Sequence, residues 1–369
     1  MKDLCIDARM LLASGIGTYL RSLLPFLAKS SFRLRLIVNK ELIEQLPWLS
    51  RFSLEILEAP IYSLAEQLQL PAAIGRSDLF WSPHYNIPLL KIRAHKRLVT
   101  IHDVNHLVFK KTLSMAQRIY AHAVMRQAVQ RSAHIITVSE FSKIELCKYV
   151  RAPEHKITAI HNGLDTKRFT AEDDGRSAEI KKRYRLPEKY FLFVGNVKPH
   201  KNLAGLIRAY RIAGDPLKEY PLLVVGKREG FLQADSESQQ LIEQFALHGE
   251  IRFLDFIVDE DLPALYRLAT ATIFPSLYEG FGFPAIEAMS AGSPLAVSHA
   301  SSLPEVCGDA ALYFDPHQPE DIARVLVQLT THPQLLRTLK EKGKQHCQKF
   351  CWEKCAAEHL RVMEALCKT

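Results

Sequence analysis

The residues best suited to chemistry are two glutamates that flank a pair of glycines. Glu279 and Glu287 lie on either side of Gly280, Gly282 and Pro284. The glycines allow a sharp turn that presents backbone N–H groups, and Pro284 suits the first position of a helix, where no N–H is needed. A glycine turn at a helix start predicts an anion site. Glu287, in the predicted first turn, could accept hydrogen bonds from two vicinal hydroxyls, or it could merely complement the helix dipole.

A second candidate group follows another apolar run. The segment VGNVKPHKN leaves a predicted strand at Gly195 and enters a helix near Asn202, with Lys201 at the helix start. An ammonium group there could neutralise a diphosphate, although Lys201 could also be an ordinary solvated lysine. Ligands of open parallel sheets bind beyond the carboxyl ends of the strands. The sequence therefore predicts a site for a phosphorylated, hydroxyl-rich ligand in the second half of the chain.

The elements that must position these residues alternate along the whole chain. Short β-branched or aromatic runs are separated by helical patterns, and the runs are nearly continuous in apolar residues, which is typical of parallel sheets covered by helices on both faces. The polar stretch 170–189 lacks a strand pattern. We expect an N-terminal domain over 1–169, a C-terminal domain over 170–351, and a final helix over 352–369 that could cross back to the first domain. The predicted strands are 4–7, 33–38, 78–83, 98–103, 134–139, 156–163, 190–196, 222–227, 251–256, 271–276, 294–298 and 311–316.

Composition and charge narrow the class of protein. The 369 residues are 47% hydrophobic and 24% charged, as in soluble globular proteins. The apolar runs are too short to span a bilayer, and Asp3 and Asp7 interrupt the first one, so we expect a cytoplasmic protein. Residues 1–165 hold 22 Lys and Arg against 13 Asp and Glu, whereas residues 166–369 hold 26 against 27. The basic half is expected to meet an anionic membrane, a pyrophosphate-linked acceptor or nucleic acid, and the last lacks a recognition motif.

Two patterns could suggest a metal but are better explained without one. Asp259 and Asp261 have the spacing of a metal-binding pair, but they precede a helical pattern and are predicted to cap it. Cys347, Cys351 and Cys355 are four apart and would share one helix face as small core residues. Their spacing matches no familiar ligand set. No metal site is therefore predicted.

The motifs GIGTYL, IHD, VSEFSK, HNGLD and EGFGFPAIE, together with the loop that carries Lys201, give the chain a family resemblance. It resembles glycosyltransferase family 4, also called the group 1 glycosyltransferases, from Gly15 to Trp352, and is most similar to the mannosyltransferase-B-like branch. The resemblance implies an α/β protein of the GT-B fold, with two Rossmann-like doubly wound parallel-sheet domains facing across a cleft. It also implies a retaining, metal-independent hexosyltransferase, with the acceptor in the N-terminal domain and the donor in the C-terminal domain.

The same resemblance implies roles for residues of the second half. Glu279 would contact the transferred sugar and Glu287 the nucleotide ribose. The backbone of Gly282, Phe283 and Pro284 would meet the sugar and the diphosphate. These residues form the expected donor site, with no metal.

Further expected site residues come from three other motifs. Lys201 would neutralise the diphosphate, and Asn196 stands where the family usually has an arginine. Gly15 and Gly17, in a predicted loop, would let the backbone approach the donor phosphate. His102, at the end of a predicted strand, would hydrogen-bond the sugar or steady charge near the anomeric carbon, although a purely structural role is an alternative. His102, Lys201 and Glu279 are the expected catalytic residues.

Two further positions were interpreted from the motifs. Asp255 stands where the family usually has glycine, close to the nucleobase pocket, so the nucleobase stays open. Ser139, in VSEFSK, is predicted to cap a helix.

The function we expect is transfer of a sugar, preferably mannose, from a nucleoside-diphosphate sugar to a glycan or lipid-linked acceptor in cell-surface polysaccharide or lipopolysaccharide biosynthesis. No cofactor beyond the donor co-substrate and no nucleic acid are expected. A GT-B-type nucleotide-sugar epimerase or a non-catalytic sugar-nucleotide-binding protein are the alternatives. The basic amphipathic pattern over 110–131 could rest on an anionic membrane, at the inner face of the cytoplasmic membrane, or could be an ordinary surface helix.

Overall fold

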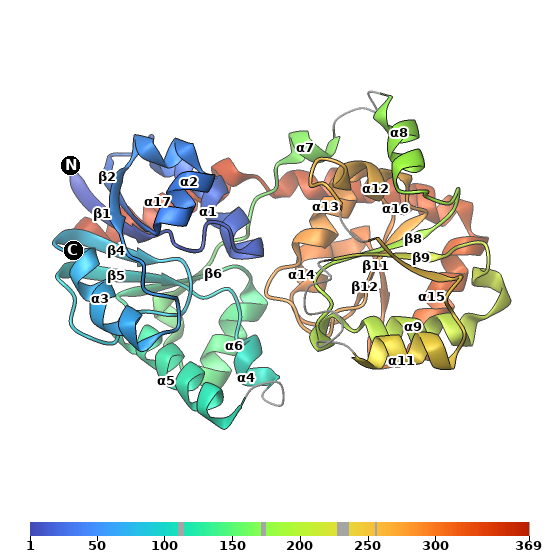
Figure 1. The fold of residues 1–369 in the computed structure, drawn as a ribbon, viewed down its shortest axis with the longest axis horizontal. Helices are drawn as coiled ribbons and strands as arrows, with labels where there is room; N and C mark the ends of the chain where they lie inside the picture. Colours follow the sequence, from blue (N-terminus) through green and yellow to red (C-terminus); the bar gives the residue numbers. More distant parts are fainter. Residues whose placement is uncertain (110–113, 171–174, 227–235, 255–256, 369) are drawn as a thin grey trace. The chain divides into compact units, whose positions relative to one another are not determined.

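The chain folds into two compact units (Figure 1). The computed structural model describes residues 1–109, 114–170, 175–226, 236–254 and 257–368. Unit 1 comprises Met1–Gly163 and Phe350–Thr369, and unit 2 comprises Leu164–Lys349. Within the described part of the chain, no helix is both long enough and apolar enough for a membrane span.

Unit 1 is built on a seven-stranded parallel sheet in the order β3-β2-β1-β4-β5-β6-β7. In this sheet Ile6 of β1 pairs with Trp81 of β4, and Asp7 pairs with Ile37 of β2. The strand that the sequence did not predict is the edge strand β3, whose residues are all at least partly exposed and form no apolar run. The strands are β1 (Lys2–Asp7), β2 (Phe32–Val38), β3 (Ser53–Ile56), β4 (Ser77–Ser82), β5 (Ala94–Thr100), β6 (His134–Thr137) and β7 (Ile157–Ala159).

Helices pack on both faces of this sheet because neighbouring strand residues point in opposite directions. Phe80 packs with Leu70 and Ile74 of one helix. The next residue, Trp81, instead lies against Tyr19 and His359 of two other helices, with ring centroids 5.9 and 6.0 Å apart. The helices are α1 (Ser14–Leu27), α2 (Lys40–Gln45), α3 (Leu64–Ile74), α4 (Asn105–Val108), α5 (Met115–Arg131), α6 (Glu140–Val150) and the C-terminal α17 (Trp352–Lys368).

A buried chain of hydrogen bonds ties α17 to α1 and the sheet. Trp81 Nε1 donates to Thr100 Oγ1 at 3.0 Å, and Thr100 Oγ1 lies 3.0 Å from the Tyr19 hydroxyl. His359 Nδ1 lies 2.7 Å from the Cys355 carbonyl and must donate to it, so its Nε2 accepts from the Tyr19 hydroxyl at 2.5 Å. Each donor thus has one acceptor, and His359 is neutral.

Unit 2 is built on a six-stranded parallel sheet in the order β10-β9-β8-β11-β12-β13. Its core joins Phe193 and Val224 of the sheet to Leu206, Tyr210 and Leu326 of two helices. The strands are β8 (Phe191–Val194), β9 (Leu222–Val225), β10 (Ile251–Leu254), β11 (Ala271–Phe274), β12 (Leu295–Ser298) and β13 (Leu312–Phe314).

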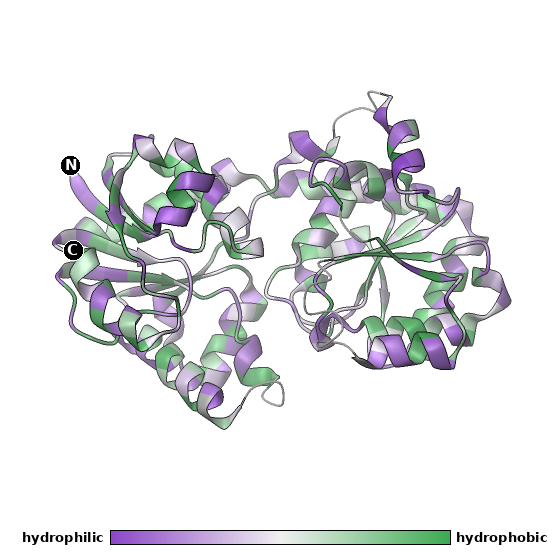
Figure 2. Cartoon of the chain, in the orientation of Figure 1, coloured by the Kyte–Doolittle hydropathy of each residue, from purple (hydrophilic) through white to green (hydrophobic). Residues whose placement is uncertain are grey.

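Helices also cover both faces of the second sheet. In Figure 1, α9, α11 and α15 lie on one side and α12, α13 and α16 on the other. Figure 2 shows the strands of unit 2 as mainly hydrophobic, and the strands of unit 1 and the surrounding helices as mixed. The helices are α7 (Thr166–Thr170), α8 (Arg176–Arg183), α9 (Leu203–Ala213), α11 (Ser236–Gln244), α12 (Leu262–Leu268), α13 (Phe283–Ala291), α14 (Leu303–Cys307), α15 (Pro319–Thr331) and α16 (Pro333–His346).

Two parallel α/β domains confirm the predicted fold class, the Rossmann-like pair of the GT-B fold. The predicted cap is also confirmed, since Ser139 Oγ accepts the N–H of Ser142 at 3.1 Å. Asp261 occupies the N-cap position of α12, as predicted, but its side chain does not cap the helix. Its carboxylate instead accepts from Arg183 and Tyr184 at 2.7 and 2.8 Å.

The prediction that three cysteines share one helix face was wrong. Cys347 lies in a short 3-10 helix, Cys351 precedes α17, and Cys355 lies within α17. Cys347 and Cys355 are nevertheless buried, as small core residues should be.

His359 should make unit 1 sensitive to acid. Burial lowers the pKa of His359 from 6.5 to about 4. Between these two pH values His359 is protonated in the unfolded chain but neutral in the folded chain. The stability that His359 contributes is full above pH 6.5 and is lost as the pH falls towards 4. From pH 7.5 to pH 5 we expect a loss of about 2 kcal/mol from this residue.

Urea unfolding followed by tryptophan fluorescence tests this, because Trp48, Trp81 and Trp352 all lie in unit 1. The variant His359→Gln should remove this part of the pH dependence, whereas His95→Gln, at an exposed position, should leave it in place. An equal loss of stability in wild type and His359→Gln would contradict the assignment.

Candidate functional site

The loop after β8 presents Lys201 at the carboxyl end of the second sheet. Pro199–Lys201 form a 3-10 turn, and Asn202 then begins α9 in the left-handed conformation, with φ of 57°. The Asn202 amide donates to the Pro316 carbonyl at 2.8 Å. The backbone carbonyl of His200 accepts the N–H of Leu277 at 2.7 Å. This bond joins the Lys201 loop to the loop after β11.

The loop after β11 presents Glu279 and is held through its backbone by two serines. Ser301 Oγ accepts the N–H of Glu279 at 3.0 Å. Ser302 Oγ reaches the carbonyls of both Glu279 and Phe281, at 3.0 and 3.1 Å. The sequence reasoning missed both serines, although they lie in the loop that follows β12 and therefore at the same carboxyl edge. They leave the Glu279 carboxylate to be positioned by another group.

That group is Lys201. Its Nζ lies 2.5 Å from Glu279 Oε1, and the two side chains are only 15% and 12% exposed. The same ammonium lies 5.2 Å from the ring centroid of Phe274, an arrangement that also favours a cation. The structure thus brings together two of the three expected catalytic residues. An ammonium and a carboxylate at this distance can neutralise one negative ligand group and accept from a hydroxyl.

Beside this pair, Gly282 begins α13. Its φ of 102° is one that other residues rarely adopt, and a Cβ there would lie 2.8 Å from Leu303 Cδ2. Gly282 has no side chain to cap the helix, so an anion can satisfy the first N–H groups of α13. Pro284 occupies the second helical position, after Phe283, and not the first as predicted.

Glu287 lies in the second turn of α13, which corrects the prediction of a first-turn position. Its role is therefore not that of a helix-dipole partner, since that effect is confined to the first turn. The Tyr266 hydroxyl donates to Glu287 Oε2 at 3.0 Å. Burial raises the pKa of Glu287, while the Tyr266 hydrogen bond and the charge of Arg168 oppose the rise. Sequence reasoning did not find Tyr266 or Arg168, which lie in other elements.

Asn196 is exposed on the same loop as Lys201, directly after β8. Its expected contact with the donor stays a prediction. Asp255, which was interpreted as a neighbour of the nucleobase pocket, lies outside the described residues.

His102 lies in unit 1, just beyond the end of β5. Its Nε2 donates to the Pro83 carbonyl at 2.9 Å, and its own carbonyl accepts from Ser142 Oγ at 2.9 Å. Burial lowers its pKa, so the ring is neutral with the proton on Nε2, and Nδ1 carries a lone pair. The imidazole edge packs against Tyr19 at a centroid distance of 5.0 Å. His102 is fixed as a hydrogen-bond acceptor at the carboxyl edge of the first sheet.

Gly15 and Gly17 do not form the predicted loop, because both lie in α1. A Cβ on Gly17 would lie 2.4 Å from the Leu11 carbonyl oxygen, so close packing explains this glycine. Gly15 is exposed, and a Cβ there would meet nothing within 4 Å.

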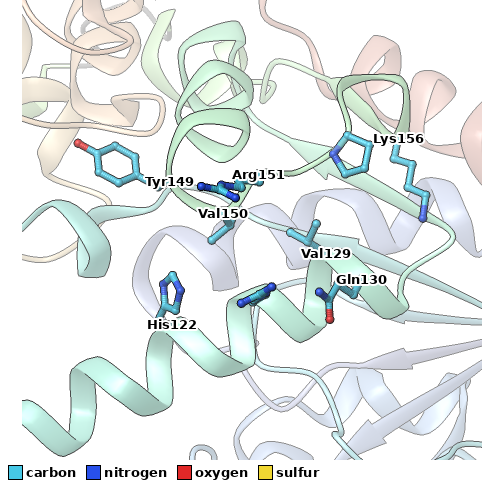
Figure 3. A pocket seen from close by; sticks show the side chains of 9 residues that line it. His122, Val129, Gln130, Tyr149, Val150, Arg151 and Lys156 are labelled. Carbon is cyan, nitrogen blue, oxygen red and sulfur yellow. The ribbon is translucent and has the colours of Figure 1, made fainter.

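A basic cavity of about 750 Å³ lies in unit 1 beside α5 and α6 (Figure 3). In Figure 3, His122 projects from α5, while Tyr149 and Arg151 come from the end of α6. Arg126 and Lys156 complete its ionisable lining, so the charges that line it among the described residues are positive. A cavity of this kind can hold an anion. The predicted basic residues Lys110 and Lys111 lie outside the described part of the chain.

Within the described ranges, no three His, Cys, Asp or Glu side chains are grouped so that they could hold a metal ion.

Comparison with known proteins adds an independent line of evidence. A model described as Glycosyltransferase Family 4 matches residues 13–168, and one described as Glycosyl transferases group 1 matches residues 176–346. The O-antigen chain mannosyltransferase B of Escherichia coli is 29% identical over 290 residues, which are 78% of this chain and 74% of that protein. The O-antigen chain mannosyltransferase RfbU of Salmonella typhimurium is 30% identical over 256 residues, 69% of this chain and 66% of that protein.

Solved structures share the fold over nearly the full length. A sucrose-phosphate synthase from Thermosynechococcus elongatus superposes with a TM-score of 0.81 at 21% identity, covering 99% of each chain. Anabaena HepE, in complex with UDP and glucose, gives a TM-score of 0.80 at 16% identity and covers 99% of this chain and 100% of its own. The two mannosyltransferase relatives favour sugar transfer over the epimerase and the non-catalytic alternatives. The chain belongs to glycosyltransferase family 4, the group 1 glycosyltransferases.

Proposed function

We propose that this glycosyltransferase moves mannose from a nucleoside-diphosphate sugar to a glycan or lipid-linked acceptor, with retention of configuration and without a metal ion. The observation that carries the proposal is the Lys201–Glu279 pair beside the uncapped start of α13. The names of two relatives, both O-antigen chain mannosyltransferases, support mannose as the sugar and cell-surface polysaccharide as the product. The complex of HepE with UDP and glucose supports a nucleotide-sugar donor.

In the proposed donor site, different residues of unit 2 contact different parts of the nucleotide sugar. Lys201 and the first N–H groups of α13, beyond Gly282, neutralise the diphosphate as it leaves. Glu279 accepts from hydroxyls of the transferred sugar. Glu287 accepts from the ribose hydroxyls, which requires its ionised form, and the Tyr266 hydrogen bond favours that form.

The transfer step balances without a protein nucleophile. The bond between the anomeric carbon and the diphosphate oxygen breaks, and the acceptor oxygen bonds to the same face of that carbon. The acceptor proton passes to the departing diphosphate oxygen. Lys201 stabilises the charge that develops on this oxygen, and Nδ1 of His102 is an acceptor suited to a hydroxyl of the transferred sugar.

The basic cavity supports a further part of the proposal, contact with an anionic membrane at the inner face of the cytoplasmic membrane. Arg126 and Arg151 are exposed at its rim. Exposed Ile119 and Met115 lie on the same helix, α5. A cationic patch next to apolar side chains suits a surface of anionic lipid.

The ion pair itself can be tested by a double-mutant cycle in the free enzyme. Lys201→Met leaves the Glu279 carboxylate without its cation, and Glu279→Gln leaves the ammonium without its anion. Each single variant should lower the free energy of unfolding, and the double variant should lose less than their sum, with a coupling of about 2 kcal/mol. Calorimetric melting of the four proteins gives the coupling. Strict additivity would mean that the pair contributes nothing to the site.

Activity tests the donor site. Lys201→Ala and Glu287→Ala should each lower mannosyl transfer from GDP-mannose to a lipid-linked oligosaccharide about 100-fold or more, while circular dichroism shows an intact fold. The matched control is Lys189→Ala, because Lys189 is 52% exposed and pairs with Glu219 on the surface of unit 2. An unchanged rate in either site variant would refute the assignment. Activity that needs magnesium, or a product of inverted configuration, would refute the corresponding part of the mechanism.

Sedimentation with liposomes tests the membrane proposal. The wild-type protein should pellet with vesicles that contain phosphatidylglycerol and stay in the supernatant with pure phosphatidylcholine, because attraction to lipid phosphates is electrostatic. The double variant Arg126→Glu, Arg151→Glu should lose this binding, whereas Arg208→Glu, on the surface of unit 2, should keep it. Equal recovery with both kinds of vesicle would rule out the contact.

A further inference from the structure

We propose that Tyr62, Tyr85 and His106 form the subsite for a pyranose ring of the acceptor. We refer to these three residues as the aromatic platform. The inference rests on the proposed function, since it assigns the acceptor-binding residues of that reaction.

The platform is a continuous group of rings in unit 1. The Tyr62 and Tyr85 rings lie 6.0 Å apart and are tilted by 32°, and the His106 ring follows at 5.5 Å from Tyr85. Tyr62 is 46% exposed, His106 is exposed, and Tyr85 is partly exposed. Solvent therefore reaches a surface that combines aromatic faces with hydroxyl and imidazole groups.

Its position is the ligand-binding edge of the sheet. Tyr62 follows β3, Tyr85 follows β4, and His106 follows β5. The carboxyl ends of parallel strands meet at one edge, where ligands of such sheets bind. His102, the expected contact to the transferred sugar, belongs to the same segment as His106, and Asp103 between them accepts the N–H of Asn105 at 2.9 Å.

Tyr62 is held in a backbone conformation that a tyrosine disfavours. Its φ is 68°, and such strain persists only where the surroundings enforce it, commonly at functional sites. The enforcing contact is the Glu66 carboxylate, whose Oε2 accepts the N–H of Tyr62 at 2.7 Å. Glu66 is fully buried, so a buried charge is used to fix an exposed ring.

A buried ionic cluster beneath the platform fixes Glu66 in turn. Arg9 donates to Glu66 at 2.5 Å and to Asp7 at 2.7 Å. Asn86 donates at 2.6 Å to Glu66 Oε2, the oxygen that also accepts from Tyr62, and accepts from the Tyr120 hydroxyl at 3.2 Å. Desolvating such charges is costly, and an apolar core would be at least as stable. The cluster instead joins the segments after β1, β3 and β4 into one rigid base.

The chemistry of the platform selects a neutral sugar. Aromatic faces pack against the C–H groups of a pyranose, and tyrosyl and imidazole edges exchange hydrogen bonds with its hydroxyls. Burial raises the pKa of Tyr62 and of Tyr85, and both hydroxyls are protonated at neutral pH, as tyrosine hydroxyls ordinarily are. None of the three platform residues is a lysine or an arginine, but His106 also lines a cavity of about 770 Å³ together with Arg118 and Arg126.

Saturation-transfer NMR on the full-length protein with methyl α-mannopyranoside tests the inference, with GDP present throughout. The wild type should transfer magnetisation to the sugar ring protons. Tyr62→Gly removes the ring and relieves the strained backbone, so it should fold and bind the sugar about tenfold more weakly. Tyr85→Leu should weaken binding similarly, whereas Tyr62→Phe should retain most of it. Leu64→Ala, at an exposed neighbour of Tyr62, should behave as wild type.

Thermal shifts with GDP, and mannosyl transfer, separate this inference from the proposed function. If GDP binds and transfer proceeds, but methyl α-mannopyranoside gives no signal or binds Tyr62→Gly and Tyr85→Leu as well as wild type, the platform is not the acceptor subsite and the proposed function stands. If GDP does not bind and no sugar is transferred, the proposed function fails first. A rise in the acceptor KM of Tyr62→Gly at nearly unchanged kcat would support the platform.

Discussion

The proposed donor site depends on one ion pair, between Lys201 and Glu279. Lys201 and Glu279 come from loops that follow different strands, and they meet at 2.5 Å with little exposure to water. A carboxylate there, without the ammonium, would be a desolvated charge with no partner. The His200 carbonyl, which accepts from the N–H of Leu277, and the Ser301 hydroxyl, which accepts from the N–H of Glu279, hold the two loops. The two charges thus nearly cancel. In the proposed function, a diphosphate competes with Glu279 for the ammonium, and the start of α13 supplies the remaining stabilisation.

The two domains and most of their strands and helices could be predicted from the sequence alone, because strands buried on both faces have nearly continuous apolar sequences. The edge strand β3 does not, since its partly exposed residues lack that signal. Local spacing also misplaced Gly15 and Gly17, which resemble a turn but lie within a helix. Glycine is needed at position 17 because a Cβ there would meet the Leu11 carbonyl oxygen. This contact depends on the fold of the segment that precedes the helix.

Site residues that belong to one sequence motif could be predicted. Their partners from other helices and loops could not. Lys201 and Glu279 were expected in the same site, but their direct contact depends on the register of β8 and β11. Tyr266, which supports Glu287, comes from a separate helix and is preceded by no motif. The buried cluster around Arg9 in unit 1 is also assembled from distant segments. Reading residues at each strand end identifies candidates, but it does not identify their partners.

The central claim is that a bound diphosphate lies between an ammonium group and a helix start, without a metal ion. A crystal structure with GDP or UDP, grown in the presence of a chelator, tests it most directly. The account predicts that the diphosphate contacts Lys201 and the backbone at Gly282 and Phe283, and that the ribose contacts Glu287. Nucleotide bound elsewhere, or bound here only when magnesium is restored, would contradict it.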